Sequence, residues 1–243
     1  MKVTFFNGSP KGKNGNTNII IELLIEGMKE AGAEAESVSL SEKRIEQCKG
    51  CLSCFTATPG RCCINDDMSG LLVKYMDSDI VGFASPLFSC NMTGLLKNFL
   101  DRTIPLKSAQ TVKDENGDFY HPTIHVNFPK VIAVSNCGFP GENNFWVLKH
   151  AFSVYNPIAE IYRNAGETLR ADGGGVGIYG ADIIPRIKEY KANLRKAGYE
   201  IIKEGAISQK TMDDLNKPLE DDENIMNSLN TYFESEQKNE KRG

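Results

Sequence analysis

Several patterns that assign proteins to common classes are missing from this sequence. No apolar run approaches the roughly 18 residues of a membrane-spanning helix. The first residues lack the zones of a secretory signal peptide, so we expect a cytoplasmic location. Positive charge is not in excess, because 28 Lys and Arg against 32 Asp and Glu give a net charge of −4. We therefore expect no binding to nucleic acid or to a membrane surface.

Familiar catalytic and nucleotide-binding motifs are absent as well. The chain has no G-x-G-x-x-G stretch, and Gly12-Lys13 is followed by Asn14, so neither a Rossmann fingerprint nor a Walker loop is present. The three histidines show no metal-ligand spacing, and we expect His121 and His125 to face solvent. No Ser-His-Asp or paired-carboxylate motif emerges, so the sequence predicts no classical acid–base catalytic residue.

What the chain does have is an alternation of short strands and helices. Its 243 residues are 40% hydrophobic, which is enough for one sizeable core. Strands are predicted at 2–6, 33–40, 80–84 and 131–134, and helices at 17–32, 68–76, 93–100, 145–164 and 185–203. Pro157 is expected to kink or split the fourth helix, and Leu169 with 173–180 is predicted to form a strand edge and a loop. The alternation indicates an α/β fold whose parallel sheet is covered on both faces.

One stretch, residues 107–129, interrupts this alternation. It contains Asp-Glu-Asn-Gly-Asp at 114–118, a strong turn signal, and therefore predicts an inserted hairpin or lid. We expect one domain over 1–205 that includes this insertion. Residues 206–243 are expected to form a helical or polar C-terminal extension with one weakly helical segment, 221–233.

A polar, glycine-rich stretch follows the first predicted strand, and we call residues 8–17 the first loop. Its glycines let backbone N–H groups converge, and the start of the next helix favours an anion. Ser9, Asn16 and Thr17 add side-chain donors, and Lys11 adds charge although we expect it to face solvent. The pattern is typical of a phosphate-monoester pocket or of a flexible surface turn.

Two further strand-to-helix connections carry unusual residues. The second loop, 85–92, contains Phe88, which is either a flat wall for a tricyclic ring or an ordinary core residue. The third loop, 135–140, contains Asn136, which either bonds the polar edge of such a ring or belongs to an ordinary turn. Ligands of open parallel sheets bind beyond the carboxyl ends of the strands, so the three loops together indicate a binding site.

The three loops and the cysteines between them resemble a known family. The resemblance lies in Gly8-Ser9-Pro10 with Asn16-Thr17, in the CxGCxxC segment followed by DDM, and in SPLFSCNMTGLLKNFLDR and SNCGFP. These motifs are similar to the NADPH-dependent FMN reductase family, nearest to the branch that includes the iron–sulfur flavoproteins. The similarity spans roughly residues 1–205 and is most specific over 85–102. It implies a flavodoxin-like three-layer α/β fold with a five-stranded parallel sheet in the order 2-1-3-4-5, bound FMN, and a homodimer or homotetramer.

The resemblance also implies which residues bind the cofactor. It assigns the FMN phosphate to Ser9, Asn16 and Thr17, and Lys11 is counted with them for its charge. It assigns the ring and ribityl surroundings to Pro86, Leu87, Phe88, Ser89 and Asn91, and the edge of the ring to Ser135, Asn136, Cys137 and Gly138. We expect Cys90 and Cys137 to be small loop residues near the ring.

Five of the seven cysteines fall between Cys48 and Cys63. In a cytosolic chain they are not expected to form disulfides. Cys48, Cys51 and Cys54 have the spacing C-x2-C-x2-C. Four thiolates can surround a [4Fe–4S] cluster, and we favour Cys62 over Cys63 as the fourth ligand. The alternatives are a zinc site, or no metal with the cysteines as small buried or redox-active side chains.

Together these features predict a flavin-dependent NAD(P)H oxidoreductase. Electrons would pass from the nicotinamide through FMN to a quinone, a flavin, or another small-molecule or protein acceptor. Phe119, Tyr120 and Trp146 are expected to line the substrate side. A second hypothesis is an iron–sulfur flavoprotein that transfers electrons with ferredoxin, and a third is a flavin-binding or docking module without turnover of its own.

Overall fold

A computed structural model describes residues 1–173 and 181–240 of the chain. Within these residues the centre is a parallel sheet of five strands, β2-β1-β3-β6-β7 in spatial order. The strands are β1 (Lys2–Asn7), β2 (Glu34–Ser39), β3 (Ile80–Pro86), β6 (Lys130–Asn136) and β7 (Ala159–Arg163). The labels skip β4 (Val112–Lys113) and β5 (Phe119–Tyr120), because these two strands pair as a separate antiparallel hairpin. The predicted α/β fold with a five-stranded parallel sheet is confirmed.

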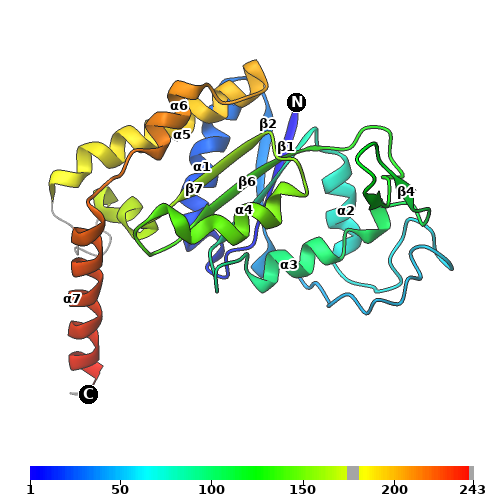
Figure 1. Ribbon diagram of the computed structural model, residues 1–243, viewed down its shortest axis with the longest axis horizontal. Helices are drawn as coiled ribbons and strands as arrows, with labels where there is room; N and C mark the ends of the chain where they lie inside the picture. The colour runs from blue at the N-terminus through cyan, green and yellow to red at the C-terminus, as the bar shows by residue number, and fades with distance from the viewer. Residues whose placement is uncertain (174–180, 241–243) are drawn as a thin grey trace.

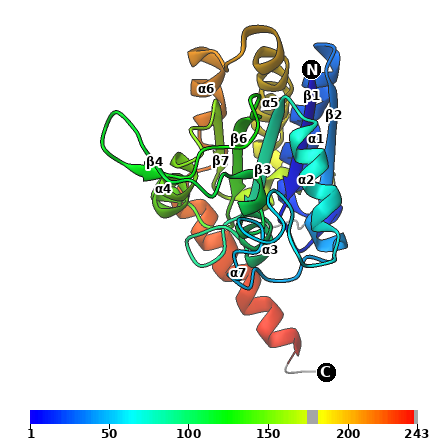
Figure 2. The same ribbon diagram turned by 90° about the vertical axis from the view of Figure 1, so that its right-hand side faces the viewer.

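Helices cover both faces of this sheet (Figures 1 and 2). One face carries α1 (Asn16–Glu30) and α5 (Ile184–Glu204), and the other carries α2 (Met68–Met76), α3 (Gly94–Asp101) and α4 (Trp146–Ser153). α6 (Gln209–Asn216) packs beside α5, and α7 (Asp222–Glu240) extends away from the body towards the C-terminus. None of the described helices combines the length and hydropathy needed to cross a bilayer.

The strands read as apolar runs because both of their faces are buried. In β3, Ile80 and Ala84 lie in the core shared with α1 and α5. Val81 and Phe83 lie in the second core, shared with α2, α3 and α4. Successive side chains of a strand point to opposite faces, so a central strand between two helical layers needs apolar residues at every position.

The region after α4 differs from the prediction. The helix predicted over 145–164 is wrong beyond Ser153, where α4 ends. The chain turns at Asn156, whose φ is +46°, and Pro157 follows before β7 begins. Proline has no N–H for a helix, and the alternating burial of β7 is the period-two pattern of a strand.

Two further predictions near the carboxyl end need correction. Leu169 lies in a 3-10 helix, Gly166–Gly173, and is fully buried in the core rather than on a strand edge. The rest of the loop predicted there, 174–180, lies outside the described residues. The extension after residue 205 contains two helices, α6 as well as α7, where the sequence predicted one helical segment.

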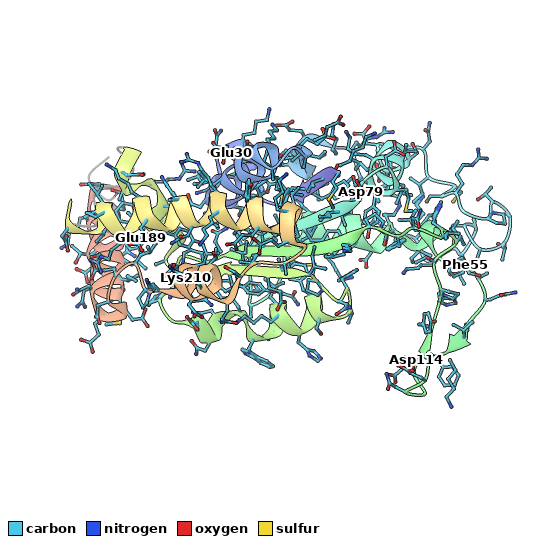
Figure 3. All side chains as sticks on the ribbon, turned by 90° about the horizontal axis from the view of Figure 1, so that it is seen from above. Glu30, Phe55, Asp79, Asp114, Glu189 and Lys210 are labelled. Carbon is cyan, nitrogen blue, oxygen red and sulfur yellow. The ribbon has the colours of Figure 1, made fainter. Side chains whose placement is uncertain are left out.

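The insertion lies against the segment that carries the clustered cysteines, which we call the cysteine segment (residues 43–67). Figure 3 shows the hairpin, with Asp114 near its tip, at the same end of the molecule as Phe55 of the cysteine segment. The ring centroids of Phe55 and His121 are 5.1 Å apart. Both predicted solvent-facing histidines, His121 and His125, are exposed.

Helices α1 and α5 approach each other closely at two glycines. A Cβ atom on Gly27 would lie 1.8 Å from the Arg195 carbonyl oxygen, and one on Gly198 would lie 2.1 Å from the Leu24 carbonyl oxygen. Real Cβ atoms do not come so near to backbone, so any larger residue would push the helices apart. This contact sets how tightly the α1–α5 layer sits on the sheet.

We predict that Gly198→Ala lowers the free energy of unfolding by about 1–3 kcal/mol, because overpacking forces backbone shifts. The matched control is Gly70→Ala in α2, where a Cβ would meet nothing within 4 Å. There the higher helix propensity of alanine should raise stability by up to about 1 kcal/mol. Urea denaturation of both variants measures the difference, and equal effects would contradict the close-packing argument.

Candidate functional site

The loops that follow four strands of the sheet meet at one edge. The first loop follows β1, the second loop continues from β3, and the third loop continues from β6. The 3-10 helix Gly166–Gly173 follows β7 at the same edge. In open parallel sheets this carboxyl-terminal edge is where ligands bind.

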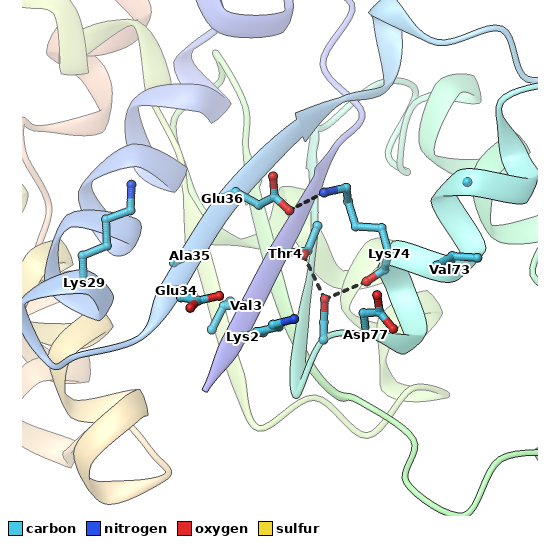
Figure 4. Close-up of a pocket in the computed structure, with 12 residues that line it drawn as sticks. Lys2, Val3, Thr4, Lys29, Glu34, Ala35, Glu36, Val73, Lys74 and Asp77 are labelled. Atoms are coloured by element: carbon cyan, nitrogen blue, oxygen red, sulfur yellow. Dashed lines mark hydrogen bonds and ion pairs between the residues drawn. The ribbon is translucent and has the colours of Figure 1, made fainter.

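A cavity of about 610 Å³ lies at the opposite edge, beside the amino-terminal ends of β1 and β2 (Figure 4). Its lining mixes acidic and basic side chains, and Lys74 is paired with Glu36 at 2.5 Å. The hydroxyl of Ser78 donates to that of Thr4 at 2.8 Å. This hollow lies at the edge opposite to the one where ligands of open parallel sheets bind, so the carboxyl edge is the stronger candidate.

The first loop holds two buried hydroxyls that accept hydrogen bonds but donate none. The Ser9 hydroxyl accepts a hydrogen bond from the N–H of Lys11 at 3.3 Å. The Thr17 hydroxyl accepts one from the side-chain amide of Asn136 at 2.7 Å. Both residues are buried, and neither hydroxyl donates a hydrogen bond within residues 1–173 and 181–240. Each can therefore donate to an anion.

The backbone of the first loop adds further donors. Gly15 precedes α1, and no side chain of the described residues caps the N–H groups of the first turn. A Cβ on Gly15 would lie 2.6 Å from the Ser9 hydroxyl oxygen, so glycine is what lets that hydroxyl reach the helix start. Lys11 and Lys13 are exposed on the outside of the loop. An uncapped helix N-terminus beside two hydroxyl donors suits a phosphate group.

The second loop makes a tight turn with an unusual backbone. Phe88 and Asn91 exchange both backbone hydrogen bonds, at 2.8 and 2.9 Å. The two turn residues, Ser89 and Cys90, have φ of +47° and +62°, a conformation that type I′ turns usually give to Asn-Gly. Non-glycine residues in this region cost roughly 1–2 kcal/mol each. The turn presents Phe88 to solvent with 52% of its surface exposed, so it is not a core residue.

Asn136 connects the third loop to the other two. Its side-chain amide donates to Thr17 in the first loop. Its backbone carbonyl accepts from the N–H of Leu87 in the second loop at 2.8 Å. A Cβ on Gly166 would lie 2.9 Å from Asn136 Oδ1, so the segment after β7 also closes on this residue. Asn136 at the end of β6 thus touches the loops of three other strands, through its side-chain amide, its backbone carbonyl and its close packing against Gly166.

The residues on either side of Asn136 are buried. Burial raises the pKa of the Cys137 thiol to about 11, so this thiol stays protonated at neutral pH and is a poor redox nucleophile. The hydroxyl of Ser135 has no hydrogen-bond partner among the described residues. Such an orphaned donor at a strand end is a feature that a bound polar ligand would explain.

Sequence reasoning missed Thr93, which joins the first loop to the second. Its hydroxyl donates to the Gly8 carbonyl at 2.7 Å, and its N–H donates to the Ser85 hydroxyl at 2.9 Å. The same hydroxyl caps α3 by accepting from the N–H of Leu96 at 3.3 Å. A threonine directly before a helical run is an N-cap signal, so the sequence contained the clue to its local role but not to its contacts.

The aromatic residues predicted to line the substrate side lie in two places. Trp146 begins α4 just after the third loop and is 71% exposed. Phe119 and Tyr120 form strand β5 of the hairpin, which the structure places against the cysteine segment, and both are exposed. Trp146 thus lies near the third loop, whereas Phe119 and Tyr120 lie near the cysteine segment.

A buried ion pair closes the base of the cysteine segment. The guanidinium of Arg102 contacts both carboxylate oxygens of Asp66, at 2.7 and 3.0 Å. It also donates to the Glu46 carbonyl at 2.5 Å, and Asp66 accepts from the N–H groups of Glu46 (2.8 Å) and Met68 (3.1 Å). Residues 46 and 66 are held together by these bonds, so all five clustered cysteines lie on one closed loop.

The same contacts keep both members of the pair charged. Burial would raise the pKa of Asp66, but hydrogen bonds from Arg102 and from the backbone of Glu46 outweigh it and lower this pKa. Burial would lower the pKa of Arg102, but Asp66 raises it, with a smaller contribution from Cys62. Arg102 therefore places a fixed positive charge next to the cysteines.

The clustered cysteines share one cavity with Arg102, which is lined by Cys48, Cys51, Cys54, Cys62 and Cys63. The sulfur atoms of Cys51 and Cys63 are 3.7 Å apart. Hydrogen bonds from Ser53, and then Cys63, lower the pKa of Cys51 to about 7, whereas burial and neighbouring thiolates raise that of Cys54. Among the residues that the structure describes, no three His, Cys, Asp or Glu side chains are grouped closely enough to hold a metal ion.

Comparison with known proteins gives iron-sulfur flavoproteins and a putative NAD(P)H-dependent FMN-containing oxidoreductase of Bacillus subtilis. Residues 1–117 match the NADPH-dependent FMN reductase family. An iron-sulfur flavoprotein of Archaeoglobus fulgidus is 29% identical over 228 residues, which cover 84% of this chain and 98% of that protein. An iron-sulfur flavoprotein of Methanocaldococcus jannaschii is 32% identical over 117 residues, which cover 48% of this chain and 59% of that protein.

Solved structures share the fold at low sequence identity. An FMN-dependent NADH-azoreductase from Bacillus anthracis, in complex with FMN, has a TM-score of 0.58 at 13% identity and covers 83% of this chain and 99% of its own. An NAD(P)H:quinone oxidoreductase from Methanothermobacter marburgensis has a TM-score of 0.55 at 15% identity, with 83% and 96% covered. The fold and its carboxyl-edge loops define a flavodoxin-like α/β protein. More specifically, the N-terminal part of the chain, residues 1–117, is similar to the NADPH-dependent FMN reductase family, and a still longer stretch is similar to an iron-sulfur flavoprotein.

We predict that Asp66→Asn lowers the free energy of unfolding at pH 7 by about 3–5 kcal/mol, because it leaves the buried charge of Arg102 unpaired. The pKa of Asp66 is lowered by folding, so its contribution is present above the unfolded carboxyl pKa of about 3.9 and is lost as the pH falls through the folded pKa. Urea denaturation should show that the difference in the free energy of unfolding between wild type and variant becomes smaller below about pH 4.

The control is Asp101→Asn, which removes the exposed partner of Lys97. Its cost should stay below about 1 kcal/mol. A gap for Asp66→Asn that is unchanged between neutral and acid pH would contradict the role of the ion pair.

Proposed function

We propose that this protein binds FMN at the carboxyl edge of its sheet and uses NAD(P)H to reduce a quinone, a flavin or another electron acceptor. The observation that supports this most is the set of buried hydroxyls in the first and third loops. Ser9, Thr17 and Ser135 all have unused donor capacity at the one edge where this fold binds ligands. Bound FMN would supply the hydride and electron chemistry, and the protein would bind and orient it.

The first loop is the proposed phosphate site. The hydroxyls of Ser9 and Thr17 and the uncapped N–H groups of α1 would donate to the phosphate oxygens, with Asn16 and Lys11 at the rim. The ring and ribityl chain would be bound by the second and third loops, through Pro86, Leu87, Phe88, Ser89, Asn91, Ser135, Asn136, Cys137 and Gly138. The exposed ring of Phe88 suits an apolar wall beside an aromatic cofactor.

We predict that the purified protein binds FMN and that its yellow colour bleaches when NADH or NADPH is added without oxygen. Ser9→Ala should weaken FMN binding about 10- to 100-fold, because it removes a buried donor to a charged group. Ser235→Ala on the exposed part of α7 is the matched control and should bind as wild type. Fluorescence titration and anaerobic absorbance measure both effects, and a colourless protein that refuses FMN would end the proposal.

A second function, electron transfer with ferredoxin through an iron–sulfur cluster, is supported by the cysteine segment. Cys48, Cys51, Cys54 and Cys62 line one cavity that also includes Arg102, and Cys62 is near enough to contribute to the raised pKa of its guanidinium. The pKa of Cys51, at about 7, gives a substantial thiolate fraction at neutral pH, the form that binds metal. These four thiols would have to draw together from the arrangement described to hold a [4Fe–4S] cluster.

We predict that anaerobic reconstitution with iron and sulfide loads about four irons per chain. Cys62→Ser should lose most of the iron and its broad absorbance, whereas Cys63→Ser, the adjacent control, should keep both. The reverse result would show that Cys63 is the fourth ligand. A wild type that takes up no iron would rule out this second function and leave the flavin chemistry untouched.

We also propose that the protein forms a homodimer or homotetramer. Helix α7 extends from the body and exposes Met226 (47%) and Phe233 (57%). Large apolar side chains on a projecting helix are available for contact with a second copy of the chain.

A further inference from the structure

One charged side chain reaches the first loop from a distant part of the sequence. Arg170 lies in the 3-10 helix after β7, and its Nε donates to Asn16 Oδ1 at 2.5 Å. A second guanidinium nitrogen donates to the backbone carbonyl of Asn14. These two acceptors belong to the loop in which the proposed phosphate site lies.

The backbone on both sides of Arg170 is held in place. Thr168 and Leu169 before it are fully buried, and Thr168 donates to the Ala165 carbonyl at 2.7 Å. Asp172 after it is paired with Lys191 of α5 at 2.6 Å. The Arg170 side chain is thus delivered to the first loop by an anchored segment rather than by a free end.

The contacts of Arg170 prepare the first loop for an anion. The carbonyl of Asn14 and the amide oxygen of Asn16 carry partial negative charge that would repel a phosphate. By binding both, Arg170 neutralises these acceptors and leaves the Asn16 N–H donors and the hydroxyls of Ser9 and Thr17 for the ligand. Lys11 and Lys13, in contrast, are exposed and make no side-chain hydrogen bond in the described part of the chain.

Guanidinium chemistry fits this position. Arginine carries five N–H donors in a planar fork and stays charged at all physiological pH values. Two of its nitrogens are used on the loop, and donors on the guanidinium remain for phosphate oxygens. Charge-assisted hydrogen bonds of this kind are stronger than those of neutral donors, so such a residue discriminates between a phosphorylated ligand and its unphosphorylated form.

We propose that Arg170 selects the phosphorylated form of the flavin, binding FMN through its phosphate and leaving riboflavin binding unaffected. This inference rests on the proposed flavin site. It predicts that FMN binds much more tightly than riboflavin and that most of the difference disappears when Arg170 is neutralised.

The test is a fluorescence titration of flavin-free protein with FMN and, separately, with riboflavin. Arg170→Gln should weaken FMN binding about 10- to 100-fold and change riboflavin binding less than about twofold. Arg170→Lys, which keeps the charge but not the fork, should fall between wild type and Arg170→Gln. Arg186→Gln, at an exposed arginine on α5 that pairs with Glu220, is the matched control and should bind both flavins as wild type.

The possible results distinguish a phosphate-binding role of Arg170 from a purely structural one. Equal losses for FMN and riboflavin in Arg170→Gln would show that Arg170 only holds the loop together, and no loss for either would also overturn the proposal. Wild type that binds FMN no more tightly than riboflavin would contradict phosphate selection while leaving the flavin site standing. Wild type that binds neither flavin would overturn the proposed function itself, and this inference with it. Raising the salt concentration should weaken FMN binding in wild type more than in Arg170→Gln.

Discussion

The side-chain amide of Asn136 is the interaction on which the carboxyl edge of this protein depends. Backbone hydrogen bonds join neighbouring loops at a few points, such as Gly166 N–H to the Cys137 carbonyl at 2.7 Å, and the side chain of Asn136 adds a connection across to the first loop. The Asn136 side chain donates to Thr17 and its backbone carbonyl accepts from Leu87, and Thr93 supplies a second connection through Gly8 and Ser85. A hydrogen bond of this kind adds only about 1 kcal/mol, but an unpaired buried amide would cost about 1–3 kcal/mol, which strongly disfavours other arrangements.

The cysteine segment is organised by a different kind of interaction. A buried ion pair such as Arg102–Asp66 adds little net stability, because removing both charges from water costs about as much as their attraction returns. Its value lies in specificity: the guanidinium fork and the carboxylate fit one arrangement, and that arrangement joins residue 46 to residue 66. Because the two ends of the cysteine segment are held together at its base, the irregular chain between them does not need to pair with the sheet.

Much of the fold could be predicted from the sequence, because apolar strands alternate with helices that begin and end at recognisable residues. The apolar run of β3 and the helix that follows Thr93 are local signals, and the sequence predicted both elements. The strand β7 was missed because its five residues follow a helix without a long break, and only the turn at Asn156 and Pro157 separates them.

The candidate site was harder to predict than the fold. The first, second and third loops could be found from their composition, and their residues remain proposals for FMN binding. Contacts between distant residues could not be found in this way: Arg170 is separated from Asn16 by 154 positions, and Arg102 from Asp66 by 36. No local pattern records such pairs, because they are set by how the helices and loops pack.

The start of α7 is joined to the residue just after the third loop by a contact of the same long-range kind. The Asp222 carboxylate accepts a hydrogen bond from the N–H of Gly141 at 3.2 Å. With 19 residues, α7 is about 28 Å long. A tilt of about 10° at that anchor would move the far tip of the helix by about 5 Å. A small movement of the third loop would therefore become a larger displacement of any molecule that contacts the end of α7.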